Sequence, residues 1–380
     1  MLWFYMDEAR PYILQYTSST FILVSLVNLS TEESNPQTRD AVLFLVGAVL
    51  LCGSSLMGVI FSLYFGLAFL FLWVSRENLL SLQRRPSVVL SGVASSIIML
   101  ALGSYYLWTL QLGARASGHG KTNLMSIAFS WYELLGFSGI GPSRTALREN
   151  PIDALMPFTL HLGIGFCVLA AFVLLGFEKI RNIIEIKKIS RWFPIVLVAI
   201  ASTVTVLLLG VFAEFRTVGR HLMPIYPFIL LAFAQFGNAM WERVNRIPRL
   251  LTVTFLAYFL FSSISLRISP RFAKDDYRSA AKAAQTTCNE GGIVWCAADQ
   301  AGAKYYGLSL NTETSHTESS SVFPIFNNTP DSLVALPRPI TIILSKTDIY
   351  DSGGSLREWI KVHDFTLAET FPAFQVFVPK

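Results

Sequence analysis

Hydrophobic residues in this chain gather into long runs that are almost free of charge. Most of these runs approach the roughly 20 residues that an α-helix needs to cross a bilayer core about 30 Å thick. The pattern predicts about eight transmembrane helices, close to residues 11–29, 41–53, 56–74, 88–110, 154–176, 194–212, 222–240 and 250–266. We therefore expect an α-helical polytopic membrane domain.

One stretch without charge, residues 41–74, is too long for a single crossing. As one helix it would extend about 50 Å at 1.5 Å per residue, well beyond the bilayer core. Small residues, Gly53, Ser54 and Ser55, lie in the middle of it. We predict two short helices that meet at these three residues.

The C-terminal part follows a different pattern, in which helical and strand periods alternate. Helices are predicted over 275–284, 300–306 and 355–362, buried strands over 292–297 and 339–344, and a closing strand pair over 365–370 and 375–378. The Ser/Thr/Asn-rich segment 311–321 is typical of a surface loop. The pattern predicts a small α/β soluble domain, without a glycine-rich phosphate loop or a nucleophile elbow.

Composition supports this division. The whole chain is 53% hydrophobic and 14% charged, with a mean hydropathy of +0.50, whereas soluble domains carry about 25% charged residues. Residues 1–268 hold 20 basic and 13 acidic residues, and residues 269–380 hold 10 and 12. We assign 1–268 to the transmembrane domain and 269–380 to the soluble domain. The basic excess lies in membrane-flanking loops, so it gives no argument for nucleic-acid binding.

Basic residues are distributed unequally between the two sets of loops. Twelve Lys or Arg occur among the 48 residues of 30–40, 75–87, 177–192 and 242–249, and seven among the 60 residues of 1–10, 110–152 and 214–220. Because cytoplasmic loops are enriched in Lys and Arg, the first set is predicted to be cytoplasmic. The second set and the whole C-terminal domain are then extracytoplasmic, at a plasma membrane such as the bacterial inner membrane.

This topology places the N-terminus outside, although residues 1–10 are neither a signal peptide nor a span. A truncated or misassigned start explains this better than a first helix inserted with its N-terminus outside.

Four cysteines are too few for a disulfide scaffold or a zinc ribbon. Cys52 and Cys167 lie in apolar runs and are interpreted as small core residues. Cys288 and Cys296 fall in the soluble domain, where either a disulfide or two unlinked thiols fit the sequence. The Asn-x-Thr motif at Asn327 is short enough to occur by chance.

Acidic and basic residues precede the first helix at the predicted outer face: Asp7, Glu8 and Arg10. Acids at a helix N-terminus complement the helix dipole, so one interpretation is a cap with a snorkelling Arg. The other is a pair of acids that binds a metal or an acceptor, beside an Arg that binds phosphate.

A second outer cluster contains Arg216, Arg220 and His221, followed by Pro224 and Pro227. Guanidinium groups bind phosphate oxygens bidentately, so this cluster suits a lipid-linked phosphate or pyrophosphate. Ordinary interfacial basic residues are the structural alternative.

The long outer loop 110–152 contains Tyr132, Glu133 and Arg144 among apolar and aromatic residues. Such a segment can lie along the interface as a lid over a lipid headgroup. Packing as a re-entrant loop is the competing interpretation. His161, in the next helix, is interpreted as a hydrogen-bonded core residue rather than a ligand.

Three short motifs, in order, resemble those of the GT-C type membrane glycosyltransferases, which take a sugar from a polyprenyl-phosphate donor. They are Asp7-Glu8-Ala9-Arg10-Pro11-Tyr12, Arg220-His221-Leu222-Met223-Pro224, and Asp275-Asp276-Tyr277-Arg278 at the start of the soluble tail. The chain looks most similar to the bacterial branch that is protein-mannosyltransferase-like or lipopolysaccharide-sugar-transferase-like. The resemblance implies sugar transfer at the outer face to an envelope glycan, lipid or protein.

Within this resemblance, Arg10, Arg216, Arg220 and His221 would hold the donor phosphate. The resemblance assigns Asp7 and Glu8 to a secondary motif, where they would bind a divalent metal cation or the acceptor, and they could stand in as the catalytic acids. The chain departs from the family in one respect, because the first outer loop that carries the usual catalytic acid has no counterpart.

That departure favours a second hypothesis, a non-catalytic partner subunit or transport component of an envelope-polysaccharide system. A transporter normally has charged residues within its spans and repeat symmetry, and neither is evident in this sequence.

Overall fold

The computed structural model of this chain describes residues 12–31, 37–76, 86–111, 122–183, 186–212, 217–242, 246–273, 275–311 and 321–380. These residues divide into two compact units. One comprises Met1–Gly141 with Thr159–Arg267, and the other comprises Pro142–Phe158 with Ile268–Lys380. Each unit is described separately below.

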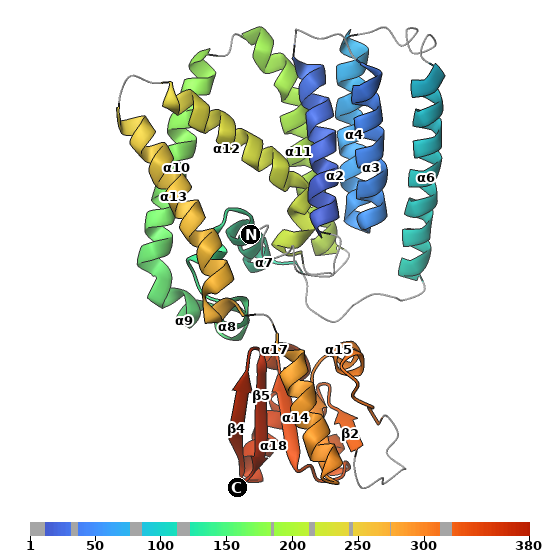
Figure 1. The fold of residues 1–380 in the computed structure, drawn as a ribbon, viewed down its shortest axis with the longest axis vertical. Helices are drawn as coiled ribbons and strands as arrows, with labels where there is room; N and C mark the ends of the chain where they lie inside the picture. The colour runs from blue at the N-terminus through green and yellow to red at the C-terminus, as the bar shows by residue number, and fades with distance from the viewer. Residues whose placement is uncertain are drawn as a thin grey trace. The chain divides into compact units, whose positions relative to one another are not determined.

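The first unit is helical (Figure 1). Its elements are α2 (Tyr12–Ser30), α3 (Thr38–Ser54), α4 (Leu56–Arg76), α6 (Pro86–Gln111), α7 (Leu124–Leu134), η1 (Phe137–Gly139), α10 (Thr159–Ile183), α11 (Ile186–Phe212), η3 (Gly219–Ile225), α12 (Tyr226–Trp241) and α13 (Arg246–Ile268). All eight predicted apolar segments form helices. Within the described residues, seven helices are long and apolar enough to cross a membrane, and α3, with 17 residues, falls just short of that length.

The predicted break in the longest apolar run is confirmed. Helix α3 ends at Ser54, Ser55 has an extended backbone, and α4 begins at the next residue. Helix α4 then folds back along α3, where the Ser62 hydroxyl donates to the carbonyl of Ala48 at 3.2 Å. One extended residue is therefore enough to turn the hydrophobic run into an antiparallel helix pair.

Helices α2 and α3 pack closely because small residues line their contact. A Cβ atom added to Gly47 would lie 2.7 Å from the carbonyl oxygen of Ser18. At one end of the pair, the buried Asp40 carboxylate accepts from Asn28 Nδ2 at 2.9 Å, and the Ser25 hydroxyl donates to the Asp40 carbonyl at 2.8 Å. Small residues and interhelical hydrogen bonds are the usual means of joining helices in lipid.

Aromatic rings join a second group of helices, α10, α12 and α13. Phe172 and Phe255 stack with their centroids 3.9 Å apart, and Phe233 meets Phe255 edge-on at 5.2 Å. Phe137, from η1, belongs to the same buried cluster. The predicted loop 110–152 therefore packs against this group of helices through Phe137.

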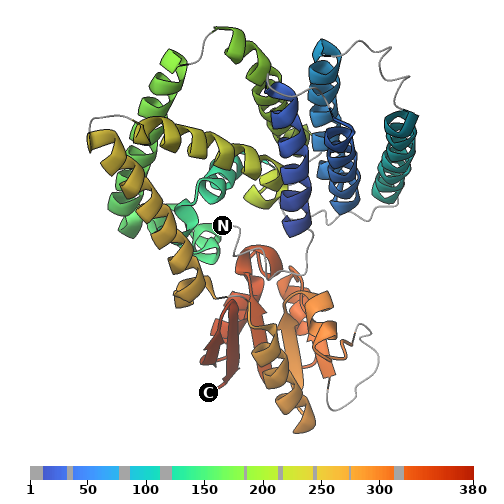
Figure 2. The same ribbon diagram turned by 45° about the horizontal axis from the view of Figure 1, so that its top comes forward.

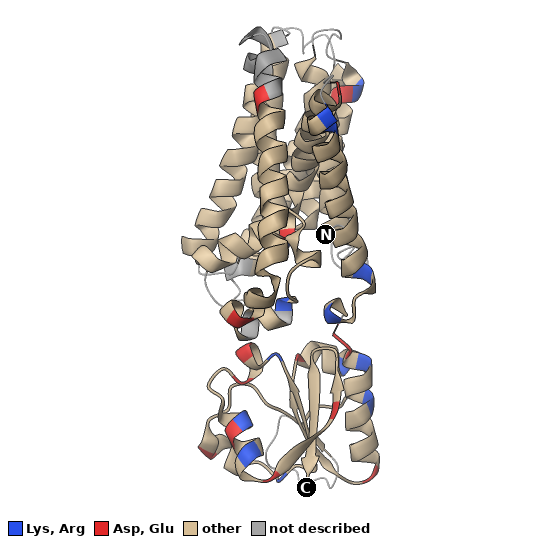
Figure 3. Cartoon of the chain, turned by 90° about the vertical axis from the view of Figure 1, so that its left-hand side faces the viewer, with Lys and Arg blue, Asp and Glu red and all other residues tan. Residues whose placement is uncertain are grey.

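Charged residues are sparse along the long helices of the first unit and concentrate near their ends (Figure 3). Most large apolar side chains on α6 and α10 are exposed, including Leu90, Leu100, Leu160 and Leu174. Apolar outer surfaces on long helices fit an integral membrane protein.

The second unit contains α8 (Arg144–Glu149), α9 (Pro151–Leu155) and η2 (Met156–Phe158), followed by η4 (Pro270–Phe272) and a five-stranded sheet (Figure 2). The strands are β1 (Ile293–Ala297), β2 (Ser321–Pro324), β3 (Thr341–Ser345), β4 (Phe365–Phe371) and β5 (Phe374–Pro379), in the order β2-β1-β3-β5-β4. Strands β2, β1 and β3 are parallel, whereas β5 is antiparallel to both β3 and β4.

Helices cover both faces of this sheet. Helices α14 (Tyr277–Asn289) and α15 (Gln300–Tyr305) pack on one face, over Val294, Cys296 and Ile343. Helices α16 (Pro330–Val334) and α18 (Ser355–Val362) pack on the other, over Trp295, Ile342 and Leu344. Short α17 (Thr347–Tyr350) follows β3.

The predicted strands and helices of this α/β domain are confirmed. The sequence pattern missed β2, α16 and α17, and most of the predicted surface loop 311–321 lies outside the described residues.

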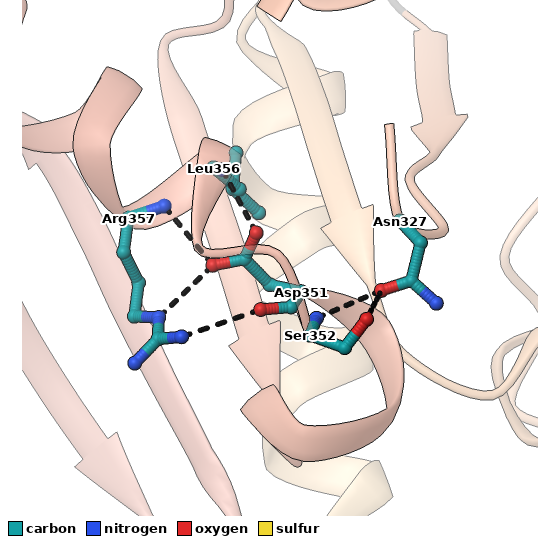
Figure 4. Close-up of polar contacts among 5 residues, drawn as sticks. All are labelled: Asn327, Asp351, Ser352, Leu356 and Arg357. Carbon is teal, nitrogen blue, oxygen red and sulfur yellow. Dashed lines mark hydrogen bonds and ion pairs between the residues drawn. The ribbon is translucent and has the colours of Figure 1, made fainter. Parts of the chain in front are cut away.

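Asn327 and Asp351 fix the loops that follow β2 and β3 (Figure 4). The Asn327 side chain donates to the carbonyl of Ile349 at 2.9 Å and accepts from both the backbone amide and the hydroxyl of Ser352. The buried Asp351 carboxylate accepts from the Leu356 amide and from Arg357 Nε. Since the amide nitrogen of Asn327 is already a donor here, the Asn-x-Thr motif has a structural role.

All four cysteines are unlinked. Of the two possibilities for the soluble domain, the structure therefore has two free thiols. Burial raises the pKa of the Cys296 thiol to about 12 and also raises that of Cys288, so both are protonated and poorly nucleophilic at neutral pH.

Candidate functional site

The segment that carries Arg220 and His221 is a short 3₁₀ helix, η3, which leads directly into α12. Val218 before it is extended, and the two prolines Pro224 and Pro227 fall where the backbone changes from η3 to α12. Proline lacks an amide hydrogen, so it is tolerated at such a helix start and disfavours a continuous helix through it. The basic pair is therefore held on a tight, buried turn.

Glu133, from the loop predicted over residues 110–152, reaches this turn. It lies at the end of α7, is 2% exposed, and its Oε2 accepts from the backbone amide of Gly219 at 2.9 Å. A carboxylate at the first amide of a helical turn satisfies an orphan donor and complements the local dipole. The structure thus brings two clusters predicted separately, the one at Glu133 and the one at Arg220, into one site.

Hydroxyl groups join the same two segments beside Glu133. The Thr122 hydroxyl donates to Thr217 Oγ1 at 2.9 Å and accepts from the Thr217 amide at 2.8 Å. Thr122 and Thr217 are both buried, and the Ser130 hydroxyl contacts the Thr217 carbonyl at 3.4 Å. These buried hydroxyl contacts were not predicted from the sequence, because single Thr and Ser residues form no distinguishing pattern.

Arg220 is the one cation of the predicted phosphate cluster whose side chain the structure describes. Its Cζ lies 5.9 Å from the ring centroid of Tyr12, a cation–π distance. Its Nε is shielded from solvent, and no hydrogen-bond partner for it is found among the described residues. A shielded guanidinium nitrogen without an acceptor is costly, and a phosphate oxygen would satisfy it.

His221 is oriented by the backbone. Its Nδ1 accepts from the amide of Val218 at 3.2 Å, which places a ring proton on Nε2. A histidine in this state is uncharged, so it contributes a hydrogen-bond donor to the site rather than a second positive charge.

The segment around Tyr132 packs into the helical unit. The Tyr132 ring stacks with Phe129 and Phe137, at 6.0 and 6.4 Å between centroids. Gly139 approaches Ser262 of α13 so closely that a Cβ atom would lie 2.0 Å from the Ser262 carbonyl oxygen. These contacts resemble the predicted re-entrant packing more than a segment that lies free on a surface.

The structure does not describe four of the other predicted site residues. Asp7, Glu8, Arg10 and Arg216 lie outside the described residues. Arg144 starts α8 in the second unit. His161 lies in the first turn of α10, where its carbonyl accepts from the Tyr258 hydroxyl at 3.2 Å, but its side chain is exposed, so its interpretation as a core residue is wrong.

The side chains that the structure describes do not form a metal site. No group of three His, Cys, Asp or Glu residues with metal-binding geometry occurs in the described ranges. Glu133 is the one carboxylate that the described residues place at this turn, and a single carboxylate is a poor donor set for a divalent metal. Metal binding therefore remains a prediction for Asp7 and Glu8.

This turn offers one group that is suited to an anion. The Arg220 guanidinium has a nitrogen without an acceptor in the described part of the chain, whereas the Gly219 and Val218 amides already donate to Glu133 and His221. No protein-family model matches the sequence, and no curated protein or solved structure shows significant similarity to it.

Proposed function

We propose that this protein is an integral membrane glycosyltransferase of the GT-C type that binds a polyprenyl-phosphate-linked sugar at the turn of Arg220 and His221. The observation that carries the proposal is the shielded Arg220 Nε, which has no acceptor in the described part of the chain. The long apolar helices of the same unit would hold the polyprenyl tail in the bilayer.

In such a transfer, an acceptor hydroxyl attacks the anomeric carbon as the bond to the phosphate oxygen breaks. Negative charge grows on the leaving polyprenyl phosphate, and a guanidinium stabilises that charge more in the transition state than in the ground state. Arg220 would carry this charge, and His221 Nε2–H would donate to a second oxygen. Glu133 is a positioning residue in this scheme, since it holds the Gly219 amide and with it the turn.

The acid that takes the acceptor proton would be Asp7 or Glu8, standing in for the family's usual catalytic acid, whose loop has no counterpart in this sequence. The acceptor would be an envelope glycan, lipid or protein on the extracytoplasmic side. The side follows from the unequal distribution of Lys and Arg between the loops, which also makes the C-terminal domain extracytoplasmic.

Donor binding tests this proposal. The full chain in lipid nanodiscs would be photo-crosslinked to a polyprenyl phosphate that carries a diazirine. Arg220→Ala should weaken labelling by about 10- to 100-fold, because a charge-assisted hydrogen bond contributes about 1.5–3 kcal/mol. Arg220→Lys keeps the charge but loses the planar fork, so an intermediate loss is expected.

Arg249→Ala is the matched control. Arg249 lies in the first turn of α13, near the C-terminal end of α12, and its Nε donates to the Trp241 carbonyl at 2.9 Å. Labelling should be unchanged in this variant. Equal labelling of Arg220→Ala and the wild type, with both folded, would remove the basis of the assignment.

A non-catalytic partner subunit is the second candidate. It is favoured by the single carboxylate that the described residues place at the turn. Such a subunit would bind the lipid phosphate but leave a radiolabelled sugar on its donor when acceptor lipids are supplied. Transfer that depends on Arg220 and on Asp7 or Glu8 would establish the enzyme.

A further inference from the structure

The parallel part of the sheet has a topological switch point between β1 and β3. The chain leaves β1 towards α15, on the face covered by α14, whereas it leaves β3 towards α17 and α18, on the opposite face. The two loops therefore diverge at the carboxyl ends of adjacent parallel strands. In open α/β sheets, this is the place where ligands bind.

Polar side chains gather at this edge around Tyr277, the first residue of α14. The Lys346 ammonium lies 5.8 Å from the Tyr277 ring centroid and pairs with the Asp275 carboxylate. Burial, together with the nearby Tyr350, Asp275 and Asp299, raises the pKa of Tyr277, so its hydroxyl stays a hydrogen-bond donor at physiological pH. These groups come from three segments: the start of α14, the start of α15, and α17 with the residue before it.

A buried hydroxyl lies beneath the same cluster. Ser345, the last residue of β3, is 2% exposed, and its Oγ has no hydrogen-bond partner in the described ranges. Ser345 pairs directly with Phe374 on β5, and paired residues of antiparallel strands project to the same face. Because Tyr277 packs edge-on against Phe374 at 4.8 Å, Ser345 faces the Tyr277 side of the sheet.

The residue after Ser345 has a strained backbone. Lys346 has φ 41° and ψ 69°, the left-handed region that glycine adopts at little cost and lysine rarely does. Strained residues of this kind concentrate at ligand sites, where the side chain is needed more than the relaxed backbone. A glycine would suit the backbone better but would remove the ammonium.

The charges of the cluster restrict its ligand. Among the described side chains around Tyr277, Asp275 neutralises Lys346, and Asp299, which caps the start of α15, adds a further negative charge, so this group has no positive excess that would hold a phosphate. No group of metal-binding side chains is found here among the described residues. The groups at this edge are carboxylates, an ammonium and hydroxyls. Such groups form hydrogen bonds with the vicinal hydroxyls of an uncharged polyol.

We infer that the carboxyl edge of β1 and β3 binds a neutral sugar residue, with Ser345, Lys346 and Asp299 as hydrogen-bond partners beside Tyr277. The site belongs to the second unit alone and does not depend on Arg220 or on the proposed transfer activity.

Saturation-transfer NMR on the full chain in nanodiscs tests the inference. The probes are a panel of neutral methyl glycosides of glucose, galactose, mannose and N-acetylglucosamine, with inorganic pyrophosphate and spermidine as charged competitors. At least one glycoside should give a saturable signal that neither competitor removes.

Two variants separate binding from folding. Ser345→Ala deletes a buried hydroxyl without a partner, so the thermal midpoint should stay the same or rise while glycoside affinity falls by about three- to tenfold. Lys346→Gly relieves the strained backbone and should also weaken binding without lowering stability. Asp364→Gly is the control, because Asp364 is left-handed at φ 57° and lies at the opposite edge of the sheet.

Each remaining outcome contradicts the inference. Absence of any glycoside signal in the wild type excludes a sugar site. Displacement by pyrophosphate or spermidine shows that the edge selects charge instead. Glycoside binding that persists in both Ser345→Ala and Lys346→Gly places the ligand elsewhere. Arg220→Ala leaves this assay unchanged, so failure here is distinct from failure of the proposed donor site.

Discussion

At the scale of single residues, Asn327 shows how one amide side chain can define two loops. Its backbone is left-handed, with φ 50°, a conformation that asparagine tolerates better than most residues. Its side chain then bridges the loop after β2 to α17 and the turn after it, through Ile349 and Ser352. Backbone preference and hydrogen bonding favour the same residue type.

Asn327→Ala should therefore lower the stability of the second unit by about 1–2 kcal/mol, since it loses three partly exposed hydrogen bonds and places alanine in a strained conformation. The midpoint of thermal unfolding, measured by near-UV circular dichroism of the full chain, reports the loss. Asn327→Gly keeps the backbone relaxed and loses only the hydrogen bonds, so its midpoint should lie between those of Asn327→Ala and the wild type. A midpoint for Asn327→Ala equal to the wild type would contradict the structural role.

At the scale of elements, close helix packing depends on where the chain lacks a side chain. Gly47 on α3 faces α2 so closely that any Cβ would clash with the Ser18 carbonyl, whereas Gly92 on α6 has no atom within 4 Å of an added Cβ. These two glycines differ in their neighbours and not in their helical conformation. They form a matched pair for testing the helix contact.

Gly47→Leu should force α2 and α3 apart and destabilise the helical unit by at least 1–3 kcal/mol, roughly the cost of overpacking a well-packed interface. Gly92→Leu should have little effect. The two variants can be compared by the temperature at which half of the detergent-solubilised protein aggregates. Equal temperatures for the two variants would mean that α2 and α3 do not pack at Gly47.

Elements with a strong hydrophobic period were predictable from the sequence, and short ones were not. The break between α3 and α4 and the strands β1, β3, β4 and β5 follow from runs of apolar residues bounded by small or polar ones. Strand β2 has only four residues and follows a polar segment, so its apolar run is too short to be distinctive. Helix α17 has four residues and begins after the left-handed Lys346, which no residue-type pattern signals.

The candidate site was predictable in its residue types and not in its contacts. Arg220 and His221 stand out because basic residues are scarce on their predicted side of the membrane. Their link to Glu133 runs through the backbone amide of Gly219, 86 positions away in the chain. Every residue except proline has such an amide, so only the folded chain shows which one the carboxylate meets.

At the scale of the whole molecule, the unequal loop charges make a prediction about sidedness. Alkaline phosphatase folds only outside the cytoplasm, so a fusion after Lys380 should be active and a fusion within residues 177–192 should be inactive. Fluorescence from a green fluorescent protein fused at the same two sites should give the opposite result. Active phosphatase in the 177–192 loop, or an inactive fusion at the C-terminus, would reverse the assigned orientation.

The one-residue turn at Ser55 affects the number of membrane crossings that a topology prediction assigns to this chain. The apolar run through α3 and α4 contains no charge to mark a reversal, so a hydropathy window can register it as one segment instead of two. Each segment inverts the side of everything after it, so the parity of the count matters more than its size. An error of one at Ser55 would exchange inside and outside for every later loop, Arg220 and the entire sheet domain included.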